Sequence, residues 1–203
     1  MRYCSIDIET TGLNPDTCDI LQFAAVLDDL CDPKPLVDLP RFTTYFCKDK
    51  PISGEPYALG MHGQIFQKIA NAQRLGLEFD DRTGDRFMNI ESLPEALACF
   101  FIKNDWPMDK KNRMKVTVAG KNVAGFDMRF LNTKIKNWGQ ISFLSRTLDP
   151  AVLYLDYKND KELPDLKTCM DRANIGGEVS HTALEDALVV VKLLRHKLLK
   201  KTK

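Results

Sequence analysis

The segment RYCSIDIE, residues 2–9, alternates between two kinds of side chain and ends in two carboxylates, Asp7 and Glu9. A period of two predicts a β-strand, because successive side chains of a strand point to opposite faces. Asp7 and Glu9 therefore share one face, while Ile6 and Ile8 share the other. The strand runs at once into TTGLNPDTCD, a segment of turn formers. The fold must accommodate two acidic side chains together at the end of its first strand.

The rest of the chain predicts further strands and helices around this first strand. Runs of apolar, β-branched and aromatic residues predict strands at 20–29, 41–47, 115–122 and 141–150. Helical spacing predicts helices near 61–75, 92–104, 124–138, 164–173 and 182–199, with Ser92 as the N-cap of the second and Glu95 three residues on. Residues 77–87 are expected to form a loop or a short hairpin.

A meander of strands followed by alternating strands and helices is typical of a mixed central sheet flanked by helices, an α/β fold. The 203 residues, 44% of them hydrophobic, can build one sizeable core. We therefore expect a single domain over residues 1–203.

Charge and cysteine content limit the class of protein. The 29 basic and 28 acidic residues nearly cancel, so any binding of nucleic acid must be local. The six cysteines lack the spacing of a zinc site or a redox motif and are expected to be buried thiols of a reducing compartment. With no apolar run of membrane-spanning length, we expect a cytoplasmic protein without a membrane partner.

Several acidic residues could act together with the first pair. Two carboxylates on one strand face suit a hard divalent cation, although a half-exposed strand face would look the same. Asp127 begins a predicted helix, where it could equally favour the helix dipole. His181 and Asp186 would be about 140° apart on a helix, so they can converge only if His181 lies on the preceding loop. Otherwise both are ordinary solvated residues.

Three motifs in this order, SIDIETTGL, GKNVAGFDMRFL and HTALEDA, resemble the DEDD superfamily of 3′–5′ exonucleases. The likeness is to the branch with a catalytic histidine (DEDDh), which includes oligoribonuclease, RNase T and the proofreading subunit of bacterial DNA polymerase III. It implies an RNase H-like fold with Asp7, Glu9, Asp127 and Asp186 around two Mg²⁺ ions, which Mn²⁺ can replace. His181 would be the general base.

Under this resemblance, the reaction releases nucleoside 5′-monophosphates from the 3′ end of single-stranded DNA or RNA. Two metal ions about 3.5–4 Å apart stabilise the attacking and leaving oxygens of such a displacement. Asp7 would bridge the ions, Glu9 and Asp186 would complete the first site, and Asp127 would hold the second ion. His181, with an ordinary pKa of about 6.5, could accept the proton of the attacking water.

The same resemblance implies a site for the terminal nucleotide. Its residues are Thr10, Thr11, Gly12, Leu13, Met61, His62 and Asn122. The first four would form a grip on the 3′ end, with Leu13 as an apolar wedge against the base, unless Leu13 is simply buried. Met61 and His62 would line the base and phosphate pocket.

Some features depart from the family or leave alternatives open. Many relatives have histidine where this chain has Lys121 before Asn122, and residues 77–87 and 108–115 have no counterpart. A homodimer and an association with a polymerase are both compatible with the resemblance. The alternative function is a non-catalytic nucleic-acid-binding module on the same fold. An unrelated α/β domain would leave the four carboxylates apart.

Overall fold

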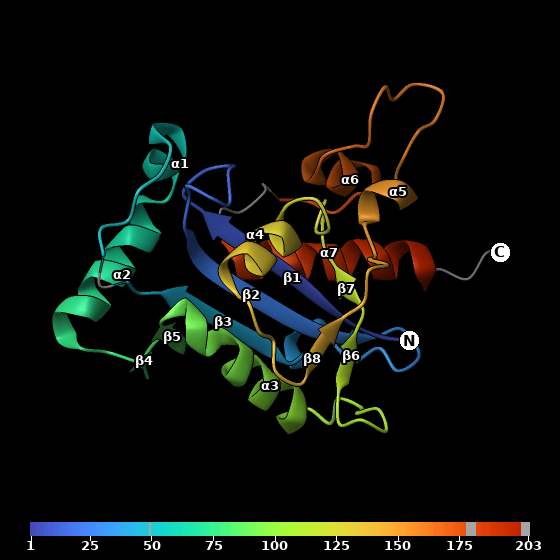
Figure 1. Ribbon diagram of the computed structural model, residues 1–203. Coiled ribbons are helices and arrows are strands. Elements are labelled where there is room, and N and C mark those ends of the chain that lie inside the picture. Colours follow the sequence, from blue (N-terminus) through green and yellow to red (C-terminus); the bar gives the residue numbers. More distant parts are fainter. Residues whose placement is uncertain (49, 178–181, 200–203) are drawn as a thin grey trace.

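In the part of the chain that the computed structural model describes, residues 1–48, 50–177 and 182–199, six strands form a mixed sheet in the order β4-β5-β3-β2-β1-β7 (Figure 1). The pairs β1–β2, β2–β3 and β4–β5 are antiparallel, whereas β7 is parallel to β1 and β5 is parallel to β3. The strands are β1 (Arg2–Thr10), β2 (Ile20–Asp29), β3 (Arg41–Phe46), β4 (Phe79–Asp80), β5 (Asp85–Met88) and β7 (Val118–Ala119). A separate parallel pair consists of β6 (Met114–Val116) and β8 (Ile141–Phe143).

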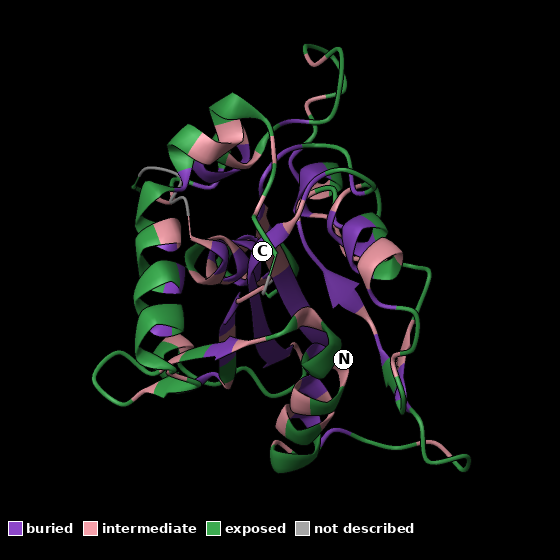
Figure 2. Cartoon of the chain, turned by 60° about the vertical axis from the view of Figure 1, so that its left-hand side comes forward, coloured by how far each residue is buried: buried purple, intermediate pink, exposed green. Residues whose placement is uncertain are grey.

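Helices cover both faces of the sheet. They are α1 (Pro56–Met61), α2 (Gly63–Leu75), α3 (Leu93–Lys103), α4 (Asp127–Lys134), α5 (Pro150–Leu153), α6 (Leu166–Arg172) and α7 (Ala183–Leu198), with 3-10 turns at Leu36–Asp38 and Ile90–Ser92. The strands lie inside the molecule and are largely buried, while the outer sides of the helices are exposed (Figure 2). This mixed α/β architecture confirms the fold class expected from the sequence.

Because the side chains of β1 alternate between its two faces, this strand packs against helices on both sides of the sheet. Ile6 and Ile8 pack into a large core with side chains from α3 and α4. On the opposite face, Tyr3 packs with Ala187 and Val190 of α7. Because both faces of the central strands are covered, β2 is buried along nearly its whole length, which accounts for its continuous apolar sequence.

The two edges of β1 differ, and this difference positions the site. On one side β1 pairs with β2 along its whole length, as far as Thr10 opposite Ile20. On the other side β7 pairs only at Cys4 and Ser5. The part of β1 that follows Ser5 is therefore open at this edge, and Asp7 and Glu9 lie in that part.

Local details both confirm and correct the expectations. The segment 77–87 was expected to form a loop or a short hairpin, and it forms a hairpin, with β4 and β5 over residues 79–88. Helix α4 is shorter than expected, because residues 121–126 form a turn with Asn122 at a φ of 53° and Ile135 is already extended. Ser92 precedes α3 but makes no capping hydrogen bond, since its backbone is helical rather than extended.

The expectation that all six cysteines are buried is wrong for half of them. All six are free thiols, but Cys31 and Cys99 are exposed and Cys47 is half-buried. Cys31 lies just beyond the end of β2, Cys47 just beyond the end of β3, and Cys99 on α3. Among the described residues, no helix combines the length and the apolar character that crossing a membrane requires.

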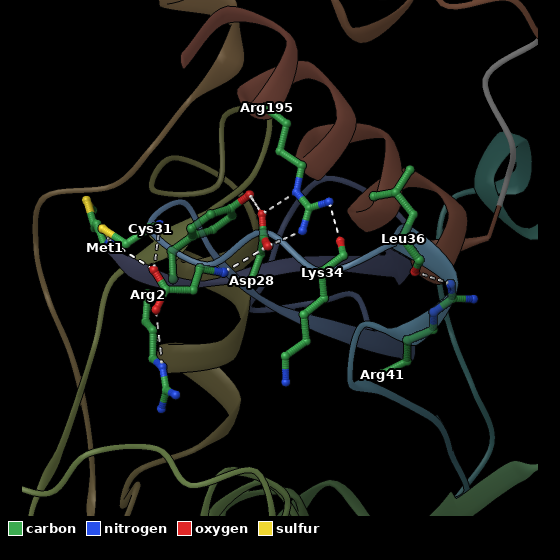
Figure 3. A network of polar contacts seen from close by, with 10 residues as sticks. Met1, Arg2, Asp28, Cys31, Lys34, Leu36, Arg41 and Arg195 are labelled. Atoms are coloured by element: carbon green, nitrogen blue, oxygen red, sulfur yellow. Dashed lines mark hydrogen bonds and ion pairs between the residues drawn. The ribbon is translucent and has the colours of Figure 1, made fainter. Parts of the chain in front are cut away.

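A buried ion pair ties the C-terminal half of α7 to the sheet (Figure 3). The guanidinium of Arg195 donates two hydrogen bonds to the carboxylate of Asp28 at the end of β2, at 2.9 and 2.5 Å. The hydroxyl of Tyr3 donates to the same carboxylate at 2.6 Å. Burial, with the Asp28 carboxylate beside it, raises the pKa of Tyr3 well above its usual range, so its hydroxyl stays protonated as a donor.

Candidate active site

Three carboxylates from two elements meet at the open end of β1. Asp7 and Glu9 project from β1, and Asp186 projects from the first turn of α7. Oxygen atoms of the three side chains all lie within 4.8 Å of one another. The structure thus brings together three of the four acidic residues that the sequence singled out, at a separation that suits shared coordination of a cation.

The fourth carboxylate, Asp127, approaches β1 from α4. It is buried, and its Oδ1 accepts a hydrogen bond of 3.0 Å from the backbone N–H of Ile8. This N–H is available because β7 has already separated from β1 at this point. Asp127 lies outside the cluster of the other three, but its charge still acts on Asp7.

Burial and mutual repulsion govern the charge state of the cluster. Burial, with the charges of Asp127, Glu9 and Asp186, raises the pKa of Asp7 well above its usual value. Burial and the Asp186 and Asp127 charges raise the pKa of Glu9 to about 8. In the described part of the chain, no lysine or arginine forms an ion pair with Asp7, Glu9, Asp127 or Asp186. Among these residues, the cluster therefore has no permanently charged partner to stabilise its ionised form.

The pKa values of the remaining two carboxyl groups are also raised. Burial raises the pKa of Asp127 to about 7, although hydrogen bonds from backbone N–H groups oppose the shift. Burial and the neighbouring Glu185 raise the pKa of Asp186 to about 7. In addition, Oδ1 of Asp186 is buried and has no hydrogen-bond partner among the described residues. Such an orphaned acceptor is unfavourable unless another group satisfies it.

The donor set fits a divalent cation. Carboxylate oxygens are the ligands that Mg²⁺ and Mn²⁺ take in proteins. A cation between Asp7, Glu9 and Asp186 would satisfy the orphaned oxygen and relieve the repulsion that raises the pKa values. Asp127 has one oxygen bonded to Ile8, which leaves its other oxygen for a second ion or its water.

Gln22 positions α7 against this cluster, and it was not singled out from the sequence. It lies directly opposite Glu9 on β2, and its Oε1 accepts a hydrogen bond of 3.2 Å from the backbone N–H of Ala183, the first residue of α7. Asp186 lies in the first turn of α7, three residues after Ala183, so this contact anchors the end of the helix that carries it. The signal in the sequence was a lone polar residue inside the apolar run ILQFAAVL.

The segment expected to grip a 3′ end, Thr10–Leu13, is a tightly held turn. The hydroxyls of Thr10 and Thr11 are buried and donate to the carbonyls of Gly12 and Ser53, so both are used within the protein. Gly12 is buried too, and a Cβ there would lie 2.6 Å from Sγ of Cys18. Leu13 is 72% exposed, which excludes the alternative that it is simply a buried residue.

A strap formed by residues 53–55 holds this turn from outside. The backbone N–H of Glu55 donates to the carbonyl of Thr11 at 2.7 Å, and Oε1 of Glu55 accepts from the N–H of Leu13 at 3.1 Å. A Cβ at Gly54 would lie 2.3 Å from the Thr11 side chain, so only glycine fits where the strap crosses the turn. The strap was not foreseen from the sequence.

The other residues predicted to bind substrate occupy different places. His62 is buried, with Nε2 3.5 Å from Oε2 of Glu9, so it lies against the carboxylate cluster. Met61 is 39% exposed at the end of α1. Asn122 is exposed and does not belong to the cluster. Its backbone N–H donates a hydrogen bond to Asp149. His181 lies outside the described residues, and α7 begins two residues later at Ala183.

Comparisons with known proteins show the fold. No protein-family model matches the sequence, and no curated protein matches it either. Among solved structures, exonuclease I aligns over 98% of this chain with a TM-score of 0.62 and 16% identity. Cell-death related nuclease 4 aligns over 96% with a TM-score of 0.60 and 14% identity. An ExoI/SSB-Ct complex aligns over 98% with a TM-score of 0.60 and 16% identity.

These likenesses span the whole sheet and its helices, so the chain shares the RNase H-like fold of these nucleases. The neighbours themselves are larger: the chain covers 42% of exonuclease I, 62% of cell-death related nuclease 4 and 42% of the chain in the complex. At this level of identity the likeness establishes the fold alone, and the chemistry has to be argued from the carboxylate cluster.

Proposed function

We propose that this protein is a metal-dependent 3′–5′ exonuclease that hydrolyses the terminal phosphodiester bond of single-stranded DNA or RNA and releases nucleoside 5′-monophosphates. The observation that carries the proposal is the group of Asp7, Glu9 and Asp186, whose oxygens lie within 4.8 Å of one another, with Asp127 beside it. Two of the fold neighbours are themselves named as nucleases, which supports this reading of the cluster.

Each carboxylate has a distinct task in this proposal. Asp7, whose pKa is raised by the charges of the other three, would hold both ions; Glu9 and Asp186 would complete one site and Asp127 would contribute to the second. Two bound Mg²⁺ or Mn²⁺ ions would activate water and stabilise the charge that develops on the phosphate and the leaving 3′ oxygen. The rigid attachment of β1, α4 and α7 keeps the ligands in place before substrate arrives.

Residues around the cluster would orient the substrate and move the proton. Leu13, exposed four residues after Glu9, would contact the terminal base, while the strap fixes the turn that presents it. His62 packs against Glu9 and limits the orientations of that carboxylate. His181 is the proposed proton acceptor for the attacking water, because an imidazole changes charge near neutral pH.

The partner in this proposal is the 3′ end of a single strand, and the site of action is the cytoplasm, where the six free thiols would stay reduced. We propose in addition that the protein forms a homodimer or associates with a polymerase.

The test is digestion of 5′-labelled single-stranded DNA and RNA of one sequence, with Mg²⁺, with Mn²⁺ and with chelator. The expected result is a ladder that shortens from the 3′ end only with metal, and nucleoside 5′-monophosphates as products. Asp7→Asn should abolish the ladder. The matched control is Asp81→Asn, at an exposed carboxylate of the β4–β5 hairpin, and it should leave the ladder unchanged.

Intact substrate in every lane would contradict the proposal and favour the non-catalytic binding module. That module would still bind the labelled strands. Asp7→Asn would change its affinity for them only by changing how much metal is bound. Fluorescence anisotropy of the same strands, with and without Mg²⁺, measures this directly.

A further inference from the structure

Two polar side chains of the sheet hold the first turns of α7 by its backbone. The amide oxygen of Gln22 on β2 accepts a 3.2 Å hydrogen bond from the N–H of Ala183. The hydroxyl of Ser5 on β1 donates a 2.8 Å hydrogen bond to the carbonyl of Ala187. Asp186 lies between these two points in the helix. The turn that carries this carboxylate is therefore held on both sides.

Both side chains are buried on the face of the sheet that α7 covers. Ser5 is 0% exposed and Gln22 is 2% exposed. Ser5 shares one face of β1 with Asp7 and Glu9, because the side chains of a strand alternate. Gln22 lies directly opposite Glu9 in the register of β1 and β2. The carboxylates of β1 and the two residues that hold α7 thus share one face of a single pair of strands.

The start of α7 depends on the sheet because its own N-cap residue does not cap it. The hydroxyl of Thr182 donates to the side chain of Glu185 and makes no capping hydrogen bond. The first N–H groups of a helix have no acceptor within the helix. Gln22 therefore supplies, from a neighbouring strand, the acceptor that an N-cap side chain ordinarily supplies.

The arrangement that these two bonds maintain is unfavourable without a cation. Oδ1 of Asp186 is buried and has no hydrogen-bond partner among the described residues, and oxygens of Asp7 and Glu9 lie within 4.8 Å of this carboxylate. Desolvation and repulsion would both favour a shift of Asp186 toward solvent. The two bonds to the sheet oppose that shift. A site whose ligands are already in place spends less free energy on ordering them when the ion binds.

We propose that Gln22 and Ser5 are positioning residues for the metal site. They hold Asp186 beside the carboxylates of β1 and thereby raise the affinity of the site for Mg²⁺ and Mn²⁺, without being ligands themselves. The inference rests on the metal site of the proposed function and deepens it. Groups that fix metal ligands from outside typically contribute about 10–100-fold to metal affinity.

The experiment measures metal binding to chelator-treated protein without substrate. Isothermal titration calorimetry gives the Kd for Mn²⁺, and competition with Mn²⁺ gives the Kd for Mg²⁺. Gln22→Met keeps the length of the side chain without its acceptor, Ser5→Ala removes the hydroxyl, and Gln22→Glu keeps an oxygen acceptor. The matched control is Tyr154→Phe, because the Tyr154 hydroxyl donates at 3.1 Å to the carbonyl of Leu193 in the second half of the same helix. The Tm in chelator is measured for every protein.

Gln22→Met and Ser5→Ala should each raise the Kd for Mn²⁺ about ten-fold. Tyr154→Phe should lower the Tm in chelator but keep the Kd within about two-fold of the parent, because it loosens α7 far from Asp186. Gln22→Glu should bind Mn²⁺ at least as tightly as the parent. Saturating Mn²⁺ should restore nucleotide release by Gln22→Met to within about two-fold of the parent, because the bound ion itself draws the carboxylates together.

Two results would overturn the positioning role: an unchanged Kd in Gln22→Met or in Ser5→Ala, or a rise in Tyr154→Phe as large as theirs. If the Tm in chelator shows that Gln22→Met does not fold, Ser5→Ala decides the question alone. A parent protein that binds no Mn²⁺ would refute the metal site, and this inference with it. A parent that binds Mn²⁺ but releases no nucleotide would refute the exonuclease function, while the Kd values still decide the positioning role.

Discussion

The carboxylate of Asp127 accepts a 3.0 Å hydrogen bond from the backbone N–H of Ile8, the residue between Asp7 and Glu9 on β1. This bond replaces the strand pairing that β1 loses where β7 departs. It fixes the distance of α4 from the other carboxylates. Asp127 therefore has a structural task and, in the proposed mechanism, a metal-binding task, and the two can be separated by substitution.

Asp127→Asn should separate them. An amide oxygen can still accept the bond from Ile8, but the side chain no longer carries the charge that a second metal ion needs. We expect a loss of exonuclease activity of at least about a hundred-fold. In chelator, the Tm should be unchanged or higher, because one repelling charge is gone.

Asp127→Ala should lose activity and also about 1–2 kcal/mol of unfolding free energy, because the N–H of Ile8 loses its partner.

The stability of the metal-free protein should fall as pH rises. The pKa values of Glu9, Asp127 and Asp186 are raised to about 8, 7 and 7. Between about 4, the value in the unfolded chain, and these folded values, the folded protein binds more protons than the unfolded chain. The free energy of unfolding then decreases with pH until about 8.

Thermal unfolding at pH 5, 6.5 and 8, with chelator and with Mg²⁺, checks this prediction. Because the ions compete with protons for the carboxylates, Mg²⁺ should raise the Tm more at pH 8 than at pH 5. A metal-induced shift that is equal at all three pH values would show that these groups do not titrate together with ion binding.

Arg195→Ala tests the tie between α7 and the sheet. It leaves the buried Asp28 carboxylate without its cation, and such a change typically destabilises by about 3–5 kcal/mol. The matched control is Arg82→Ala, because Arg82 pairs with Asp80 while its own side chain is 85% exposed. We expect little or no loss of unfolding free energy there, because solvent screens an exposed pair. Urea unfolding of both variants measures the difference, and equal effects would mean that the buried pair contributes no more than the exposed one.

The sequence was sufficient to predict those parts of the site that depend on local pattern. Alternation placed Asp7 and Glu9 on one face of a strand, and the spacing of HTALEDA predicted a helix that carries Asp186. Both depend on short-range rules, the period of a strand and the turn of a helix. The resemblance supplied the order of the motifs, and the structure brings three of their carboxylates within reach of one another.

Long-range contacts could not be predicted in the same way. Nothing in the local sequence says that Gln22 caps α7, that His62 reaches Glu9, or that Glu55 holds Leu13. Each pair is far apart in the chain and meets only because the sheet and α1 are already assembled. The start of α4 also depends on tertiary structure. The turn that follows β7 occupies residues 121–126, so the helix begins at Asp127 rather than at the expected residue 124.

Gly54→Ala should disturb the grip without touching the carboxylates. The added Cβ would lie 2.3 Å from Thr11, so the strap or the turn must move. We expect about 1–3 kcal/mol of destabilisation and a raised KM for oligonucleotides, with metal binding retained. Gly60→Ala is the matched control within α1, where a Cβ meets nothing within 4 Å. It should be neutral or slightly stabilising; a similar KM for both variants would show that the strap does not shape the substrate site.

The chain holds three histidines, so the proton acceptor can be assigned by three single variants. If His181 takes the proton of the attacking water, kcat/KM of the parent should rise with pH through an acid limb near the ordinary histidine pKa of about 6.5. His181→Ala should lower the rate by about 10²–10⁴-fold and remove this limb, while substrate binding changes little.

His196→Ala, next to Tyr154 in a different part of the molecule, should keep both the rate and the limb. His62→Ala should lower the rate by loosening Glu9 but should keep the limb. Rate profiles from pH 5.5 to 9 at saturating Mg²⁺, where ions rather than protons occupy the carboxylates, distinguish these cases. A limb that persists in His181→Ala under this condition would assign the proton transfer to another group.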